Sequence, residues 1–121
     1  MVMVGTRLYV GDNSGCRKVK CIKVLGNGKK KGTVGDCLII SVVKALPNKK
    51  IKKHDVRKVL LVRSNTNILR RNGLKISFLQ NVVLMIDIRG NPLGNRIIGS
   101  VTQELRKKKK MKILSMAPSV I

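Results

Sequence analysis

The chain has 121 residues, with 27 lysines and arginines against 5 aspartates and glutamates, and a formal net charge of +22. A protein this basic repels itself and favours a polyanionic partner, nucleic acid above all, because each neutralised phosphate releases condensed counterions. With no Trp, one Tyr and one Phe, the composition disfavours a surface that stacks bases on aromatic rings. We therefore expect contacts to phosphates and to RNA shape.

Hydrophobic residues make up 43% of the chain, enough for a packed core and too many for a disordered basic tail. The length fits one domain. Val, Ile and Leu supply nearly all of the predicted core, and the β-branched share favours strands. No apolar run approaches the roughly 18 residues that a membrane helix needs, so no membrane partner is expected.

Short apolar runs alternate with glycines and basic clusters, a spacing typical of a small β-barrel. The pattern predicts strands over residues 8–10, 19–25, 37–44, 56–63, 74–78 and 82–88. Between the first two strands, Asp12 is expected to close an Asx turn. The pair Asn72-Gly73 indicates a hairpin.

From Gly90 onward the pattern changes to loop and helix. Ser100 and Gln103 have the spacing of a capping box before a helix over residues 104–110. A second short helix is expected over residues 111–116, before Pro118. The prediction is a mainly β single domain: a barrel with a basic hairpin over residues 1–89, then a loop and short helices over residues 90–121.

The candidate reactive residues give little support for catalysis. The 3 cysteines, Cys16, Cys21 and Cys37, are odd in number and lack C-x-x-C spacing, so we expect buried thiols in a reducing compartment and no zinc site. His54, beside two lysines, is expected to be solvated or to face RNA. The acidic residues are scattered, and no phosphate loop or dinucleotide fingerprint is present. We therefore expect no enzyme, no metal and no cofactor.

Basic side chains gather in four clusters at predicted loops, over residues 29–31, 49–53, 70–71 and 106–112. A single lysine run is usually only a solvated face, but four such runs with few acidic neighbours predict contact with RNA phosphates. Arg70, Arg71 and Arg96 are the stronger candidates for bidentate contacts, because the guanidinium fork matches phosphate geometry. The residues predicted to bind RNA are Arg17, Lys18, Lys29, Lys30, Lys31, Lys49, Lys50, Lys52, Lys53, Arg70, Arg71, Arg106, Lys107, Lys108, Lys109 and Lys110.

Residues 11–26 read GDNSGCRKVKCIKVLG. This string resembles the amino-terminal block of one known family, large-subunit ribosomal protein fourteen of the bacterial and organellar type. The carboxyl part matches again in GNPLGNRIIGSV, residues 90–101, and in ELRKKKKMKILSMAP, residues 104–118. The resemblance runs co-linearly from about residue 8 to the carboxyl end.

The resemblance implies a five-stranded β-barrel with a helical carboxyl region, acting as a structural constituent on the intersubunit side of the large ribosomal subunit. It implies binding to large-subunit rRNA, contact with ribosomal proteins three and nineteen, and a bridge to small-subunit rRNA. Family members of this type also receive the ribosome silencing factor. The residues of this chain that match that surface are Asn95, Arg96 and Lys112, with Asn95 standing where Thr is typical.

The place of action follows from two features. The amino end carries neither a secretory signal nor an Arg- and Ser-rich transit helix, so we expect a product made where it works. The run at residues 107–110 is more basic than in bacterial members and closer to mitochondrial ones. The expected location is the ribosome of the mitochondrial matrix, with the bacterial cytoplasm or the plastid as alternatives. A different class of function stays open as well, a free-standing basic RNA-binding regulatory module such as a translational repressor.

Overall fold

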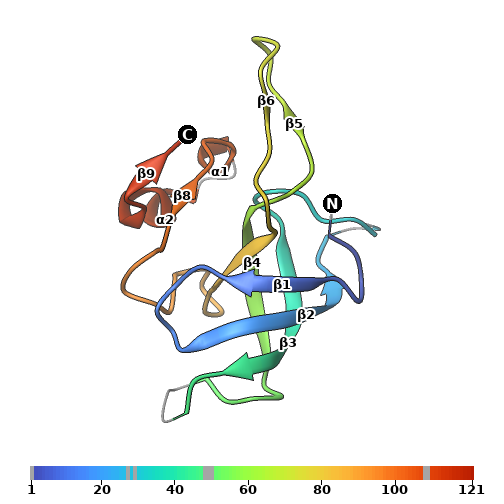
Figure 1. Ribbon diagram of the computed structural model, residues 1–121, viewed down its shortest axis with the longest axis vertical. Helices are drawn as coiled ribbons and strands as arrows, with labels where there is room; N and C mark the ends of the chain where they lie inside the picture. The colour runs from blue at the N-terminus through green and yellow to red at the C-terminus, as the bar shows by residue number, and fades with distance from the viewer. Residues whose placement is uncertain (1, 27, 29, 48–50, 108–109) are drawn as a thin grey trace.

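The computed structural model describes residues 2–26, 28, 30–47, 51–107 and 110–121. Its body is a closed barrel with strand order β1-β2-β3-β4-β7 (Figure 1). Neighbouring strands are antiparallel, except that β1 and β7 run parallel where the barrel closes. The strands are β1 (Arg7–Val10), β2 (Cys16–Val24), β3 (Cys37–Ala45), β4 (Val56–Arg63) and β7 (Val82–Met85). The mainly β fold and the five-stranded barrel are confirmed.

The core has two parts because β4 and β7 are buried on both faces. Val59 and Leu61 of β4 belong to the cluster inside the barrel. Leu60 and Val62 belong to a second cluster, which also contains Leu105 from the carboxyl-terminal region. Successive side chains of a strand point to opposite faces, so the continuous apolar run of β4 serves both clusters. The carboxyl-terminal region is thereby packed against the outside of the barrel.

A second, two-stranded sheet projects from the barrel as a hairpin (Figure 1). It consists of β5 (Ile68–Leu69) and β6 (Lys75–Ile76). Gly73, with φ of +85°, occupies the left-handed region in the turn, as the Asn72-Gly73 pair predicts. The strand predicted over residues 74–78 is thus represented by β6, which is shorter than expected and lies outside the barrel.

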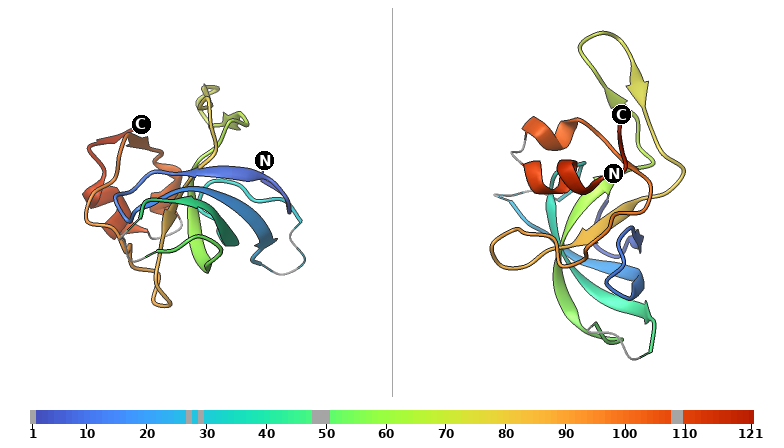
Figure 2. Two further views of the ribbon diagram at one scale, coloured as in Figure 1. Left: turned by 60° about the horizontal axis from the view of Figure 1, so that its bottom comes forward. Right: turned by 90° about the vertical axis from the view of Figure 1, so that its left-hand side faces the viewer.

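The carboxyl-terminal region contains β8 (Ser100–Val101), α1 (Glu104–Lys107), α2 (Met111–Met116) and β9 (Ser119–Val120). Figure 2 shows the two helices side by side next to the barrel. The helix predicted over residues 111–116 is confirmed. No helix among the described residues is long and apolar enough to cross a membrane.

Two expectations for this region are wrong. Ser100 is not a helix cap, because it lies in β8 and pairs with Ser119 of β9 in a parallel ladder. The neighbouring Val101 is fully buried, and its burial favours the strand over a capping turn. The helix predicted over residues 104–110 is also shorter, since Lys110 is the non-helical residue before α2.

The cysteines are free thiols, as expected. Cys16 and Cys21 are buried, with 4% and 1% of their surface exposed. Cys37 is only half-buried, so the expectation of burial is wrong for this residue. His54 is exposed and has φ of 71°. No group of three or more possible metal ligands occurs within the described part of the chain.

Candidate nucleic-acid interface

The acidic side chains are largely occupied within the fold. Asp12 and Asp36 are buried, with 8% and 6% of their surface exposed. Asp55 lies 3.9 Å from a guanidinium nitrogen of Arg57, and Glu104 forms an ion pair with Arg70. The chain has 5 acidic residues for 27 basic ones. Most of the basic side chains therefore have no acidic counterion available within the protein.

Two of the four basic clusters come together in a groove between the β5–β6 hairpin and α1. The groove is an open hollow of about 570 Å³, lined on the hairpin side by Arg70 and Arg71 and on the helix side by Arg106 and Lys107. Arg71, Arg106 and Lys107 are exposed. The sequence separates these clusters by more than a strand and a loop, so only the fold reveals that they share one surface.

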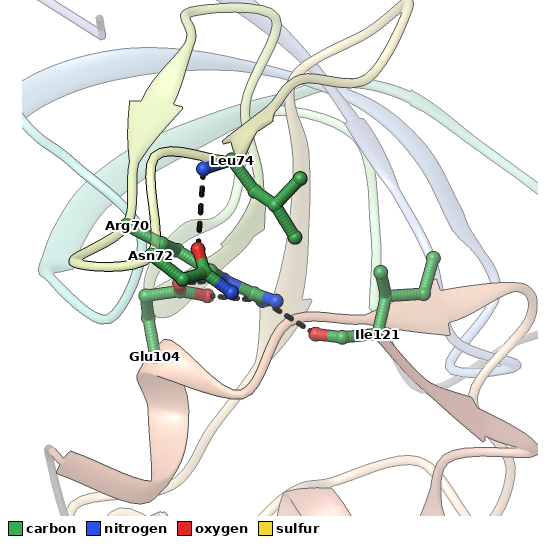
Figure 3. Close-up of polar contacts among 5 residues, drawn as sticks. All are labelled: Arg70, Asn72, Leu74, Glu104 and Ile121. Atoms are coloured by element: carbon green, nitrogen blue, oxygen red, sulfur yellow. Dashed lines mark hydrogen bonds and ion pairs between the residues drawn. The ribbon is translucent and has the colours of Figure 1, made fainter.

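Arg70 is held within this groove by an intramolecular contact (Figure 3). Its Nε donates to Oε1 of Glu104 at 2.8 Å, and its Nη2 donates to Oε2 at 3.3 Å. The same Nη2 donates to the main-chain oxygen of Ile121 at 2.6 Å. The hydrogen bond from Arg70 lowers the pKa of Glu104 below its ordinary value, and the same bond raises the pKa of Arg70.

A second part of the surface is the loop that carries Asn95 and Arg96. The side-chain oxygen Oδ1 of Asn13 accepts hydrogen bonds from the main-chain nitrogens of Asn95 at 2.9 Å and Arg96 at 3.3 Å. Gly94 lies so close that a Cβ at this position would stand 2.8 Å from that oxygen. Both candidate side chains are exposed on this loop. Sequence reasoning missed Asn13 as their support, because the two segments lie far apart in the chain.

Asp12 also supports this loop, because its carboxylate joins the turn between β1 and β2, which contains Asn13, to the barrel. Its Oδ1 accepts from the main-chain nitrogen of Ser14 at 3.1 Å, which confirms the predicted Asx turn. Its Oδ2 accepts from the main-chain nitrogen of Met85 in β7, also at 3.1 Å. The turn is therefore fixed to the barrel by a buried side chain.

Arg63 fixes the far end of the same loop. Its Nη2 donates to the main-chain oxygen of Ile98 at 2.8 Å. Gly99, with φ of +85°, leaves space for this guanidinium, since a Cβ there would lie 2.5 Å from Nη1. Burial lowers the pKa of Arg63. Its half-buried position gives it a supporting role that its basic character in the sequence did not indicate.

Lys112, the third residue of the predicted partner surface, is exposed on α2. It lines a hollow of about 300 Å³ together with Arg89, Asn91 and Lys110. The structure thus places Lys112 beside the start of the segment that leads to Asn95 and Arg96. Arg89 was not singled out from the sequence, where it stands alone between Ile88 and a glycine.

Arg17 and Lys18 lie on β2 and line a hollow of about 590 Å³ with Lys44 and Tyr9. Asn13 and Ile98 border the same hollow. The Nζ of Lys18 lies 5.3 Å from the centre of the Tyr9 ring, within the range of a cation–π contact. Lys44 was missed, although it is the cross-strand partner of Lys18. The signal available in the sequence was a charged residue near the end of the mostly apolar segment that forms β3.

The remaining predicted residues lie in two barrel loops. Lys30 and Lys31 are exposed between β2 and β3, and Lys52 and Lys53 are exposed between β3 and β4. Figures 1 and 2 show these two loops leaving the barrel at separate places. The predicted residues that lie outside the described part of the chain are Lys29, Lys49, Lys50, Lys108 and Lys109.

The comparison with known families agrees with this arrangement. The family model described as ribosomal protein L14p/L23e matches residues 1–121, which is the whole chain. Members of this family are structural, non-enzymatic constituents of the large ribosomal subunit and act in translation. With the barrel, the basic loops and this match over its full length, the chain belongs to the ribosomal protein L14p/L23e family.

Proposed function

We propose that this protein binds large-subunit rRNA through its basic loops and presents its carboxyl-terminal side on the intersubunit face of the large subunit. The observation that carries the proposal is the excess of exposed cations, +22 in net charge, on a scaffold whose acidic residues are largely buried or paired. Phosphate is the counterion that rRNA supplies in quantity, and its neutralisation drives binding through counterion release.

In this proposal the barrel is the scaffold that positions the basic loops. Its closed set of hydrogen-bonded strands fixes the ends of the loops, so less of the main chain has to be ordered when RNA binds. Contacts to phosphate position a protein on RNA without reading its sequence. Exposed loops that project in different directions suit a protein that lies among several rRNA segments.

The partner surface is proposed on the loop around Arg96 and on Lys112. In this proposal these residues meet small-subunit rRNA at a bridge, or the ribosome silencing factor where one exists, while ribosomal proteins three and nineteen lie alongside. The rigid support of the Arg96 loop by Asn13 and Arg63 favours a recognition role. The basic run at residues 107–110 favours the mitochondrial ribosome as the place of action.

The test is charge reversal on the partner surface, Arg96→Glu with Lys112→Glu. Both side chains are exposed and outside the barrel strands, so the variant should fold and enter large subunits. Subunit joining or silencing-factor binding should weaken, because like-charge juxtaposition at a contact costs on the order of several kcal/mol.

The matched control is Arg7→Glu with Lys20→Glu, which changes the net charge by the same amount. These two residues are exposed cross-strand partners on β1 and β2 and belong to neither proposed surface. Large subunits with the control variant should join normally. If subunits carrying the Arg96 and Lys112 reversals also join normally and bind the factor, the partner surface lies elsewhere.

A further inference from the structure

One acidic side chain lies inside the basic groove between the hairpin and α1. Glu104 lines the same hollow as Arg71, Arg106 and Lys107. We propose that Glu104 strengthens RNA binding as a positioning residue: through Arg70 it holds the β5–β6 hairpin against the carboxyl-terminal region, so that Arg71 faces Arg106 and Lys107 across one groove. This inference rests on the proposed rRNA-binding function and identifies how one of its surfaces is assembled.

Hydrogen bonds hold the base of the hairpin, but few other contacts hold the part beyond it. The hairpin ladder contains only two residue pairs, Ile68 with Ile76 and Leu69 with Lys75. At its base Ile68 packs against the second core cluster. Beyond the base, Leu69 and Leu74 are 70% and 58% exposed, so apolar burial contributes little to holding the tip.

The Arg70 contact supplies the missing attachment (Figure 3). The guanidinium binds Glu104 at the start of α1 and the main-chain oxygen of Ile121 after β9. Ile121 in turn is joined to the rest of that region, since its oxygen accepts from the main-chain nitrogen of Gln103. A bidentate guanidinium–carboxylate contact fixes orientation as well as distance. The hairpin is thus tied to two segments of the carboxyl-terminal region at once.

The alternative is that Arg70 binds phosphate directly and Glu104 is incidental. The two accounts predict opposite signs for Glu104→Gln. If only charge matters, removing an anion from a basic groove strengthens binding to RNA. If Glu104 positions the hairpin, the same change weakens binding although the protein becomes more basic. The sign of the effect therefore decides between them.

The experiment measures the affinity of the full-length protein for a transcript of large-subunit rRNA over a range of salt concentrations. We expect Glu104→Gln to bind at least about fivefold more weakly, since one well-placed charge-assisted contact corresponds to roughly a tenfold change. The salt slope should become shallower by about 1, as for the loss of one phosphate contact. Asp87→Asn, which removes the same charge and keeps the acceptor for the Asn91 nitrogen, should bind as tightly as the wild type or more tightly.

Two further variants keep the inference testable if the Glu104→Gln substitution also disturbs the fold. Arg70→Lys preserves the charge but not the guanidinium fork, and it should bind as weakly as Glu104→Gln. Exchanging the partners, Arg70→Glu with Glu104→Arg, keeps the net charge and restores the ion pair, and it should recover most of the affinity. The exchange variant decides between the two accounts, because a direct phosphate contact by Arg70 predicts no recovery when a carboxylate stands at position 70.

Amide hydrogen exchange separates this inference from the proposed function. Without RNA, Glu104→Gln should speed exchange in the hairpin, where the main-chain nitrogen of Arg70 donates to the Leu74 oxygen, while barrel amides stay protected. Unchanged hairpin exchange, or equal or tighter RNA binding by Glu104→Gln, overturns the positioning role and leaves the proposed function standing. Salt-independent binding by the wild-type protein would instead overturn the proposed function.

Discussion

Single residues in this protein act mainly by fixing loops, and Asp12 is the clearest case. Its carboxylate is buried and accepts hydrogen bonds from Ser14 and from Met85 of β7. The neighbouring Asn13 then holds the main chain of Asn95 and Arg96. The turn between β1 and β2, fixed to the barrel by a buried carboxylate, thus supports a surface loop that is remote in the sequence.

Asp12→Ala is therefore expected to lower the free energy of unfolding by about 2–4 kcal/mol, because it leaves the buried Met85 nitrogen and the turn without an acceptor. Chemical denaturation of the two proteins measures this difference. The control is Asp55→Ala at the more exposed contact with Arg57, where the loss should stay within about 1 kcal/mol. Equal losses at the two sites would show that the buried carboxylate has no special role.

The cysteines make a second prediction at this scale. Burial, with a smaller contribution from the charge of Asp12, raises the pKa of Cys16 to about 12. Burial also raises the pKa of Cys21. At pH 8 the thiolate fraction of Cys16 is then on the order of 10⁻⁴, and thiolate is the reactive form.

Alkylation of the native protein at pH 8 should therefore modify the half-buried Cys37 first and leave Cys16 and Cys21 largely unmodified, whereas all three react after denaturation. Chelators should not change the melting temperature. Native Cys16 or Cys21 reacting as fast as Cys37, or unfolding on addition of a chelator, would contradict this account.

Among the elements, the barrel strands were predictable and the carboxyl-terminal pairing was not. Residues 59–62 of strand β4 form a continuous apolar run, a pattern typical of a strand segment buried on both faces. The hairpin turn was predictable because Asn72-Gly73 has local turn chemistry. The strands β8 and β9 have two residues each, too short for a periodic pattern, and their parallel pairing depends on the tertiary fold. For the same reason the spacing of Ser100 and Gln103 indicated a helix cap wrongly.

The docking of the hairpin onto α1 should depend on pH in one direction. The hydrogen bond from Arg70 lowers the pKa of Glu104 in the folded protein. A lowered folded-state pKa means that the contribution of the pair is complete above the unfolded-state pKa and is lost as the pH falls through the folded-state value.

The difference in hairpin hydrogen exchange between the wild type and Glu104→Gln should accordingly be constant from neutral pH to about pH 5, after correction for the intrinsic exchange rate. It should shrink below the ordinary glutamate pKa of about 4.3. A difference that is absent at neutral pH, or that grows as the pH falls, would show that the ion pair does not hold the hairpin.

For the whole molecule, the charge imbalance is a property of composition, and it indicates the class of partner without reference to the fold. The clustering of lysines at loops is also visible in the sequence. Sequence patterns do not reveal that Arg71 shares a groove with Arg106 and Lys107, nor that the loops at Lys30 and Lys52 lie at separate places (Figure 1). Both depend on the tertiary fold, which sets where each loop leaves the barrel.

Binding of the isolated protein to large-subunit rRNA transcripts should weaken steeply with salt. For roughly 6 phosphates contacted, the logarithm of the affinity should fall with a slope of about −4 to −5 per logarithmic unit of salt concentration. Filter binding or fluorescence anisotropy over a salt series gives this slope. A nearly flat dependence would exclude phosphate contacts as the source of binding.

The most direct test of the central claim, that the protein is an rRNA-bound constituent of the large subunit, is its sedimentation with large subunits washed at moderate ionic strength, where phosphate contacts persist. Loops that bind rRNA in several directions must all detach together, so multivalent contact should retain the protein where a single contact would not. We predict an equimolar amount in the washed large-subunit fraction and none free at the top of the gradient. Complete release into the free fraction, with large subunits otherwise intact, would contradict the account and favour a free-standing RNA-binding regulator.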